Sequence, residues 1–288
     1  MTTPEPASLK IALLQLNSGD DAYANLAATV PMIREAASAG AKFVLTPEVT
    51  NLLSPDRKRQ AAILKPEAED PTLSALRAEA SAAGIWLLIG SLALKGDDPD
   101  DGRFVNRSFL IDPEGGIAAR YDKLHMFDVT ISETEQYRES SAYRPGSRAV
   151  LARAAGQPVG MTICYDLRFP YLYRDLAKAG ARILTVPSAF SPTTGKAHWE
   201  ALLRARAIET GCFVLAPAQC GTHPAPHSPD RLPRQSHGHS LAVDPWGNVL
   251  SDAGVSPGVS MVSLDLEAVD RARSRIPSLA HDRAYDGP

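Results

Sequence analysis

The sequence predicts an α/β protein, and three observations support this fold class. Short apolar runs of strand length alternate with segments in which apolar residues recur every three or four positions, the pattern of helices packed on a sheet. The 288 residues, 44% of them hydrophobic and 22% charged, suffice for one large domain or two small ones. Residues 108–115 resemble residues 240–247, which indicates a strand and hairpin used once in each half of the chain.

The first half of the chain predicts strands and helices in alternation. Leu26, Val30 and Ile33 recur at helical spacing, and Pro71 and Gly84 suit the first turn and the end of a second helix. The predicted elements are a strand at 10–16, a helix through Ala37 toward Gly40, a strand at 43–48, a helix at 71–83, a strand at 85–92, a solvated loop at 95–102 and a strand at 107–111 that enters a turn at 112–115.

The second half predicts the same alternation and then a weakly patterned end. The predicted elements are a strand at 160–164, a helix through Leu172, Leu176 and Ala177 before Gly180, a strand at 183–190, a loop at 191–196, a helix at 198–210 with Leu202, Ala205 and Ile208 facing inward, strands at 213–218, 239–243 and 259–266, and a Pro-rich irregular loop at 221–233. We predict a single domain over residues 8–270 and a charged C-terminal arm or tail at 271–288.

Composition excludes several classes of partner. A net charge of −3 and a pI near 6.2 give no reason to expect nucleic acid or an anionic membrane surface, so small molecules are the expected partners. The start of the chain lacks a signal-peptide pattern, and no apolar run reaches the ~20 residues that span a bilayer. Three cysteines are too few for a disulfide framework. These features predict a cytoplasmic protein.

Cys164 follows the apolar run 160–164 and precedes a helical pattern. A side chain at such a corner faces the open end of a sheet, near free backbone N–H groups that favour a thiolate and can hydrogen-bond an oxyanion. The corner therefore suits a nucleophile. The alternative is a buried structural cysteine, and this stretch alone leaves both interpretations open.

Glu48 and Lys123 occupy two further positions of interest. Glu48 ends a short strand at a Pro-Glu corner, which delivers it to the same kind of sheet edge as Cys164, although a surface carboxylate is the simpler interpretation of Glu48 alone. Lys123 follows the predicted hairpin directly, so part of its stem should be covered, whereas most lysines are solvated.

These residues lie in three motifs that resemble the signatures of the nitrilase superfamily of carbon–nitrogen hydrolases. The motifs are Thr-Pro-Glu at 46–48, Tyr-Asp-Lys-Leu-His at 121–125 and Ile-Cys-Tyr-Asp-Leu-Arg-Phe-Pro at 163–170. The similarity covers essentially the whole chain. Segments 187–190, 198–210, 218–221 and 238–240 are similar to the Nit branch, the amidases acting on deaminated glutathione, and to the related omega-amidases.

The resemblance implies a four-layer αββα sandwich, a homodimer or larger homo-oligomer, and no cofactor. It also implies that Glu48, Lys123 and Cys164 meet at one end of the sheets, with Glu139 as the second glutamate that is usual near the lysine. One departure is Tyr171, where many relatives have glutamate, which puts a local ion pair in doubt.

Amide hydrolysis gives each of these residues a chemical task. An amide carbon is a poor electrophile, so the reaction needs a strong nucleophile, a proton acceptor and positive charge beside the developing oxyanion. Cys164, Glu48 and Lys123 match those tasks, and the backbone N–H of Tyr165 is expected to help hold the oxyanion. We expect Glu139 to orient Lys123 or to help position the substrate.

The leading prediction for the reaction is hydrolysis of deaminated glutathione to 2-oxoglutarate and cysteinylglycine. The alternatives are omega-amidase activity on 2-oxoglutaramate, hydrolysis of an N-carbamoyl amine or a nitrile, or a non-catalytic scaffold. A scaffold has no chemical need for all of Glu48, Lys123 and Cys164.

Candidate substrate-binding residues lie beside the nucleophile. Arg168 could bind a substrate carboxylate with its planar fork, or form a structural salt bridge with Asp166. The predicted pocket-lining residues are Tyr165, Ser188, Phe190 and Thr194.

No metal site is predicted. The histidines at 223, 227, 237 and 239 lie in or near an irregular Pro-rich segment without the paired spacing of metal ligands. Cys212 and Cys220 lack a nearby partner pair, so they are expected to pack in the core.

Overall fold

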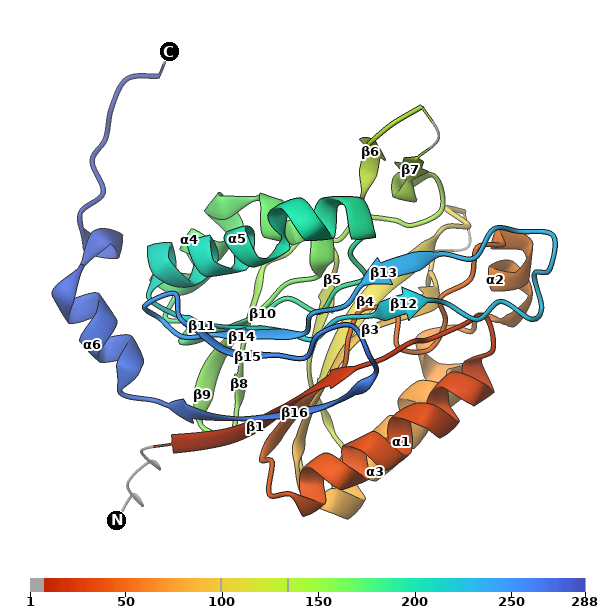
Figure 1. Ribbon diagram of the computed structural model, residues 1–288, viewed down its shortest axis with the longest axis horizontal. Helices are drawn as coiled ribbons and strands as arrows, with labels where there is room; N and C mark the ends of the chain where they lie inside the picture. The colour runs from red at the N-terminus through yellow and green to blue at the C-terminus, as the bar shows by residue number, and fades with distance from the viewer. Residues whose placement is uncertain (1–7, 99, 134, 288) are drawn as a thin grey trace.

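Two six-stranded sheets lie face to face in the computed structural model, with helices covering the outer face of each (Figure 1). The structure describes residues 8–98, 100–133 and 135–287. In spatial order, the first sheet contains β16 (Gly258–Asp265), β1 (Ser8–Gln15), β2 (Phe43–Leu45), β3 (Trp86–Lys95), β4 (Phe104–Ile111) and β5 (Ile117–Asp122), and the second contains β15 (Val249–Asp252), β14 (Leu241–Val243), β11 (Phe213–Ala216), β10 (Ile183–Thr185), β9 (Gln157–Met161) and β8 (Val150–Ala154).

Helices form the two outer layers. Figure 1 shows α1 and α3 against the first sheet, and α4 and α5 against the second. The helices are α1 (Ala22–Ser38), α2 (Arg57–Ile63), α3 (Pro71–Ala83), α4 (Pro170–Lys178), α5 (Pro192–Thr210) and α6 (Ala268–Arg275). This arrangement confirms the predicted α/β class and the αββα sandwich.

The two sheets share one topology. In the first sheet β1, β2 and β3 are parallel to one another, and β4 and β5 follow as an antiparallel hairpin. In the second sheet β9, β10 and β11 are parallel, and β14 and β15 follow as an antiparallel hairpin. The similar sequences at 108–115 and 240–247 therefore mark equivalent hairpins, as predicted.

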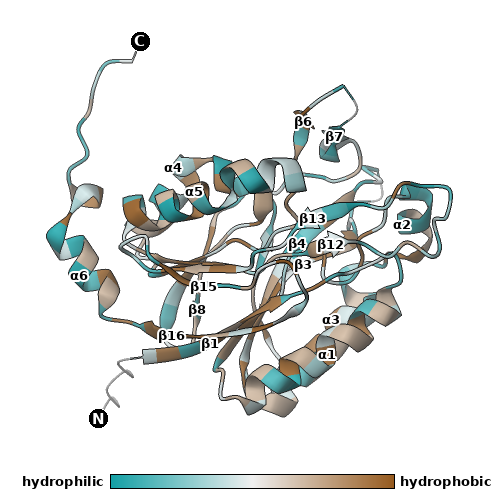
Figure 2. Cartoon of the chain, viewed as in Figure 1, coloured by the Kyte–Doolittle hydropathy of each residue, from teal (hydrophilic) through white to brown (hydrophobic). Residues whose placement is uncertain are grey.

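Strand β1 illustrates why the core requires apolar side chains on both faces of a sheet. Ile11 and Leu13 face the core between the sheets, whereas Ala12 and Leu14 face the core beneath α1 and α3. A strand buried on both sides has a continuous apolar sequence rather than an alternating one. Figure 2 shows the resulting apolar strands beneath helices of mixed character.

Helix α5 differs from its prediction in both its start and its phase. It begins at Pro192 rather than 198, because Ser191 caps it by accepting the Thr194 N–H and Pro192 occupies the first turn. The segment 191–196 is therefore mostly helix rather than loop. Its buried face includes Leu203 and Ala207, and the expected inward set was wrong: Ala205 and Ile208 are exposed and Leu202 is only partly buried.

Strand lengths also differ from the predictions near the candidate site. β10 ends at Thr185 rather than 190, and β9 ends at Met161 rather than 164. Beyond both strands the chain continues as loop or as the short 3₁₀ helix η3 (Cys164–Arg168). The other short 3₁₀ helices are η1 (Glu67–Glu69), η2 (Glu139–Ser141) and η4 (Ser278–Ala280).

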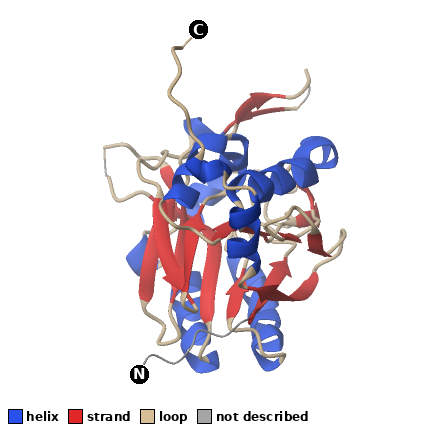
Figure 3. Cartoon of the chain, turned by 90° about the vertical axis from the view of Figure 1, so that its left-hand side faces the viewer, coloured by secondary structure: helices blue, strands red, loops and turns tan. Residues whose placement is uncertain are grey.

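Two small hairpins and the C-terminal segment complete the fold. The hairpins are β6 (Asp128–Thr130) with β7 (Gln136–Arg138), and β12 (Cys220–Thr222) with β13 (Gln235–His237), so the loop expected at 221–233 starts within β12. The division expected at residue 270 falls inside α6. Beyond η4, Asp282 pairs with Arg174 and Lys178 of α4, and the chain then extends away from the body (Figure 3). No helix within the described ranges combines the length with the apolar character that crossing a membrane requires.

Candidate active site

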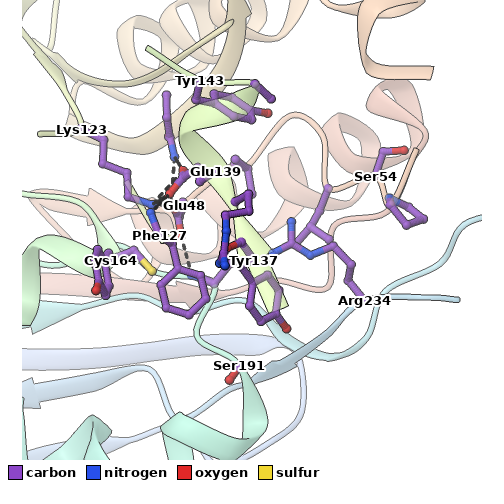
Figure 4. Close-up of a pocket in the computed structure, with 18 of the residues that line it drawn as sticks. Glu48, Ser54, Lys123, Phe127, Tyr137, Glu139, Tyr143, Cys164, Ser191 and Arg234 are labelled. Carbon is purple, nitrogen blue, oxygen red and sulfur yellow. Dashed lines mark hydrogen bonds and ion pairs between the residues drawn. The ribbon is translucent and has the colours of Figure 1, made fainter. Parts of the chain in front are cut away.

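A cavity of about 320 Å³ opens at the edge of the sandwich where the parallel strands of both sheets end. Ligands commonly bind at the carboxyl ends of parallel strands, and the volume is at the small end of the range for small-molecule sites. Glu48, Lys123, Glu139 and Cys164 all line the cavity, and Figure 4 shows their side chains gathered at one end of it. The structure thus brings together the four residues predicted to be catalytic.

Glu48 reaches the cavity from the corner after β2. Val49 adopts a φ of +49°, a left-handed conformation that is unfavourable for a β-branched residue. The Ser91 hydroxyl accepts the Val49 N–H at 2.8 Å and helps to hold this turn. The Glu48 side chain, only 6% exposed, is thereby directed into the protein interior.

Lys123 follows β5 and lies between two carboxylates. Its Nζ is 2.9 Å from Glu48 Oε1, 2.9 Å from Glu139 Oε2 and 3.0 Å from Glu139 Oε1. The lysine side chain is 2% exposed, so these are buried charge-assisted contacts. A buried ammonium paired with two carboxylates leaves one net negative charge in the cluster.

Asn106 on β4 is a member of this cluster that the sequence analysis missed. Its Nδ2 donates to Glu48 Oε1 at 2.9 Å, and the backbone N–H of Ala189 donates to Glu48 Oε2 at 2.9 Å. Among the described residues the buried Asn106 Oδ1 has no hydrogen-bond partner. Asn106 shares β4 with Arg107 and Ser108, so no signal in the sequence distinguishes it from the other polar residues of that strand.

Cys164 lies at the first position of η3 with a φ of +50°, a conformation that non-glycine residues rarely adopt. Its own N–H donates to the Pro187 carbonyl at 3.0 Å. The N–H of the next residue, Tyr165, has no acceptor among the described residues, so it is available to an oxyanion beside the thiol. This geometry agrees with the expected task of the Tyr165 N–H.

The electrostatics of the cluster place the proton on sulfur rather than on Glu48. Burial raises the pKa of the Cys164 thiol well above its usual value, and the negative charge of Glu48 raises it further. Burial alone would raise the pKa of Glu48, but the charge and hydrogen bond of Lys123 outweigh burial and hold that pKa below its usual value. A backbone N–H, that of Ala189, does lower the pKa of Cys164 as expected, but burial and the charge of Glu48 outweigh it, so the resting residue is a thiol that needs a base.

Lys123 keeps its charge for the complementary reason. Burial alone would lower the pKa of its ammonium, but the charges of Glu139 and Glu48 raise that pKa well above its usual value. The resting cluster at neutral pH therefore holds a thiol, an ammonium and two carboxylates.

These shifts predict a flat pH profile around neutrality. The carboxylate of Glu48 persists until the pH falls through a pKa below its usual value, and the Lys123 ammonium and Cys164 thiol persist until the pH rises through pKa values well above theirs. We expect kcat/KM for amide hydrolysis to vary less than about threefold between roughly pH 6 and pH 8. A tenfold change per pH unit inside that window would show that a group in the cluster titrates near neutrality.

Asp166 joins the segments that carry the lysine and the cysteine. Its fully buried carboxylate accepts the Tyr121 hydroxyl at 2.6 Å, the Ile163 N–H at 2.8 Å and the His125 N–H at 3.0 Å, and lies 2.6 Å from His125 Nδ1. Tyr171, the position where an ion pair was in doubt, instead places its hydroxyl 2.7 Å from His125 Nε2. The Asp166 carboxylate therefore links the segment that carries Lys123 with the segment that carries Cys164 in one hydrogen-bond network.

Replacing Asp166 with asparagine should destabilise the protein by about 2–4 kcal/mol. The substitution replaces one acceptor oxygen with an NH2 group, so some of the buried donors that now bind Asp166 would have no acceptor. Urea unfolding monitored by circular dichroism measures this change. Asp175→Asn on the exposed side of α4 is the control and should be nearly neutral. Equal midpoints for the two variants would contradict the joining role of Asp166.

The structure places three of the five predicted substrate-binding residues at the cavity. Tyr165, Phe190 and Thr194 line it, whereas Ser188 and Arg168 do not. Ser188 is fully buried, and its hydroxyl donates to a backbone carbonyl two residues earlier. The beginning of α5 at Pro192, which the sequence analysis placed later, is what carries Thr194 to the cavity.

Arg168 packs behind the aromatic wall of the cavity. Its guanidinium carbon lies 5.6 Å from the ring centre of Phe190 and 6.0 Å from that of Tyr165, and its Nη2 lies 3.3 Å from His198 Nδ1. The carboxylate of Asp166 is occupied by the network described above. Arg168 thus supports the two rings, and neither of the roles considered for it in the sequence analysis matches its position.

Other arginines reach the cavity from segments that the sequence analysis did not connect with it. Arg57 begins α2, Arg138 ends β7 and Arg234 immediately precedes β13. Their positions follow from loop packing, and we find no signal in the sequence that distinguishes them from the chain's other surface arginines.

His223, Cys212 and Cys220 lie in the protein interior. His223 lies buried with Nδ1 2.7 Å from the Ser18 carbonyl, and burial lowers its pKa to about 4. Cys212 and Cys220 are free and fully buried. Among the described residues no three metal-ligating side chains gather into a cluster.

Comparison with known proteins agrees with this geometry. The carbon–nitrogen hydrolase family model matches residues 10–274. The deaminated glutathione amidase of Yersinia enterocolitica is 39% identical over 278 residues, which cover 95% of this chain and 92% of that protein. The C. elegans NitFhit structure matches with a TM-score of 0.86 at 36% identity, covering 96% of this chain and 65% of NitFhit.

A second solved structure concerns the active-site cysteine of a related amidase. The structure is a variant of the amidase from Nesterenkonia sp. AN1 that shows the result of Michael addition of acrylamide at the active site cysteine. It matches with a TM-score of 0.74 at 26% identity, covering 93% of this chain and 98% of the amidase.

Proposed function

The chain belongs to the carbon–nitrogen hydrolase family, and from that premise we propose that it is a thiol-dependent amidase that hydrolyses deaminated glutathione to 2-oxoglutarate and cysteinylglycine. The observation that carries the proposal is the buried cluster in which Lys123 Nζ lies 2.9 Å from Glu48 and the pKa of Cys164 is raised partly by that same glutamate. Nucleophile, base and positive charge thus lie within one cavity.

Acylation begins with transfer of the Cys164 thiol proton to the Glu48 carboxylate. The sulfur forms a bond to the amide carbon, and the carbonyl oxygen becomes an anion that the Lys123 ammonium and the Tyr165 N–H stabilise. As the C–N bond breaks, Glu48 returns the proton to the leaving nitrogen. The products of this half-reaction are a thioester on Cys164 and free cysteinylglycine.

Deacylation uses the same groups in the reverse sense. Glu48 takes a proton from water, and the resulting hydroxide adds to the thioester carbon while Lys123 and the Tyr165 N–H again hold the oxyanion. Collapse breaks the C–S bond, releases 2-oxoglutarate and returns the proton to sulfur. Glu139 keeps Lys123 in place, since both of its carboxylate oxygens lie within 3.0 Å of Nζ.

The proposal also includes a homodimer in the cytoplasm. Support for dimerisation comes from the nitrilase-superfamily resemblance and from two large exposed apolar side chains, Ile208 on α5 at 55% and Trp246 at 50%. Light scattering coupled to size-exclusion chromatography tests it, and a monomer at micromolar concentration would contradict the dimer.

The substrate is tested by measuring kcat/KM on deaminated glutathione and on 2-oxoglutaramate side by side, with the Cys164→Ala protein as the blank. The proposal predicts a strong preference for deaminated glutathione. Preference for 2-oxoglutaramate would make the protein an omega-amidase. Activity on neither would exclude both substrates and direct attention to nitriles and N-carbamoyl amines.

A further inference from the structure

Arginines that lack a carboxylate partner border the cavity. Arg57, Arg138 and Arg234 line it from three separate segments, and no salt bridge connects any of them to a carboxylate within the part of the chain that the structure describes. Lys123, in contrast, is fully paired inside the cluster. Three guanidinium groups without an ion-pair partner around one opening can each attract an anionic ligand.

The three arginines differ in how much hydrogen-bonding capacity they retain. Arg138 donates to the carbonyls of Val129 and Tyr137 and to the Thr130 hydroxyl, so it mainly holds the β6–β7 hairpin together. Arg57 uses one nitrogen to donate to the Arg138 carbonyl at 3.0 Å. Arg234 makes no side-chain hydrogen bond to any described residue, so its whole donor fork is available.

Arg234 is nevertheless oriented. Its guanidinium carbon lies 6.0 Å from the centre of the Tyr137 ring, a contact that leaves the N–H edge free to bind a carboxylate bidentately. In Figure 4 the Arg234 side chain lies across the cavity from Cys164, with Phe127 and Tyr137 between them. An anion bound to this fork would therefore be part of a molecule that extends across the cavity to the thiol.

The nearby acidic side chains do not neutralise Arg234. Glu139 is bound to Lys123, and Glu135 accepts the Tyr137 hydroxyl at 3.2 Å and the Thr193 hydroxyl at 3.0 Å. Neither carboxylate forms an ion pair with Arg234 in the described part of the chain, so the guanidinium is free to pair with an anionic ligand.

We propose that Arg234 binds the free carboxylate of the leaving group, with Arg57 and Arg138 adding to the positive potential. This inference rests on the proposed function, in which the leaving group is a dipeptide with a carboxylate at its far end. The acyl half stays bonded to Cys164, which is 7% exposed, while the leaving half must reach solvent before the thioester is hydrolysed. The leaving half therefore occupies the solvent side of the cavity, where Arg57 and Arg234 are exposed.

Steady-state kinetics with three substrates test the assignment. The substrates are deaminated glutathione, its derivative in which the terminal carboxylate is a carboxamide, and 2-oxoglutaramate, which has the acyl half but no dipeptide. Arg234→Gln should lower kcat/KM on deaminated glutathione about 10- to 100-fold, mainly through KM, because a charge-assisted contact in the bound substrate is lost. Arg234→Lys should fall between Arg234→Gln and the wild type, since it keeps the charge and loses the fork.

The other two substrates show which carboxylate Arg234 binds. For the wild-type enzyme, kcat/KM on the carboxamide derivative should be lower than on deaminated glutathione by about the same factor as Arg234→Gln lowers it on deaminated glutathione. On the carboxamide derivative, Arg234→Gln should lower kcat/KM no further. Activity on 2-oxoglutaramate should be unchanged by the substitution. Arg231→Gln, an exposed arginine in the same loop that does not line the cavity, is the matched control and should behave as wild type.

Three results would overturn the inference. Unchanged kinetics of Arg234→Gln on deaminated glutathione would show that Arg234 does not bind the substrate. If Arg234→Gln lowered kcat/KM equally on all three substrates and left the melting temperature unchanged, Arg234 would be assigned to the carboxylate of the acyl half. An equal loss with a lowered melting temperature would assign it a structural role. If wild type hydrolyses none of the substrates, the proposed function itself fails, which is distinct from these outcomes.

Discussion

Cys164→Ala is expected to lose amide hydrolysis by at least about four orders of magnitude while remaining folded. The reason is chemical, because no other cysteine among the described residues lines the cavity, and without the Cys164 sulfur the acyl group has no atom to which it can bond. The substitution removes one sulfur atom at the wall of an open cavity, so the free energy of unfolding should change by no more than about 1 kcal/mol. Initial rates and urea unfolding measure the two quantities.

Cys220→Ala provides the matched control for this experiment. Cys220 is also a free, buried cysteine, but it lies in β12 and does not line the cavity. This variant should retain wild-type kcat/KM. Comparable turnover by the Cys164→Ala and wild-type proteins would exclude a thioester at Cys164, whatever the control shows.

Lys123→Met is expected to show the second large effect, on both activity and stability. Without the ammonium, the carboxylates of Glu48 and Glu139 repel each other and have no cation between them. This repulsion should destabilise the protein by about 3–5 kcal/mol at pH 7. Turnover should fall by roughly 10³-fold as well, because the oxyanion loses its main positive partner.

The stability defect of Lys123→Met should depend on pH with a definite sign. Once Lys123 is gone, burial raises the pKa values of the two carboxyl groups, and their protonated forms are tolerated in the interior. The destabilisation relative to wild type should therefore shrink as the pH falls from about 7 to about 4.5 and grow as the pH rises. Urea unfolding at several pH values measures it, with the exposed Lys196→Met as control. A pH-independent difference would show that lost packing, rather than uncompensated charge, is responsible.

The apolar runs predicted the α/β class and most strands of the two main sheets because they reflect burial on both faces of each sheet, whereas the αββα layering was implied only by the family resemblance. The phase of α5 could not be predicted in the same way. Its apolar residues occur on more than one side, so Ile208 looks like a core residue although it is 55% exposed. The start of α5 was predictable in principle, since Ser191 and Pro192 form a recognisable helix beginning.

The candidate catalytic residues were predictable from local motifs, whereas the residues that line the rest of the cavity were predictable only in part. Glu48 and Cys164 each lie at a strand end, and two strand ends in parallel sheets tend to meet. Arg168 lies within a motif yet supports the cavity wall from behind. Arg234 lies in an irregular segment and lines the cavity, because its position depends on how the β12–β13 hairpin packs against the rest of the chain.

The central claim, a thioester formed on Cys164, is tested most directly by acid-quenching the enzyme during turnover of deaminated glutathione and mapping its peptides by mass spectrometry. We expect the peptide that contains Cys164 to carry the 2-oxoglutaryl group, and we expect neither the peptide that contains Cys220 nor any peptide of the Cys164→Ala protein to carry it. Product formation at the wild-type rate by Cys164→Ala, with no acyl group on any peptide, would contradict it.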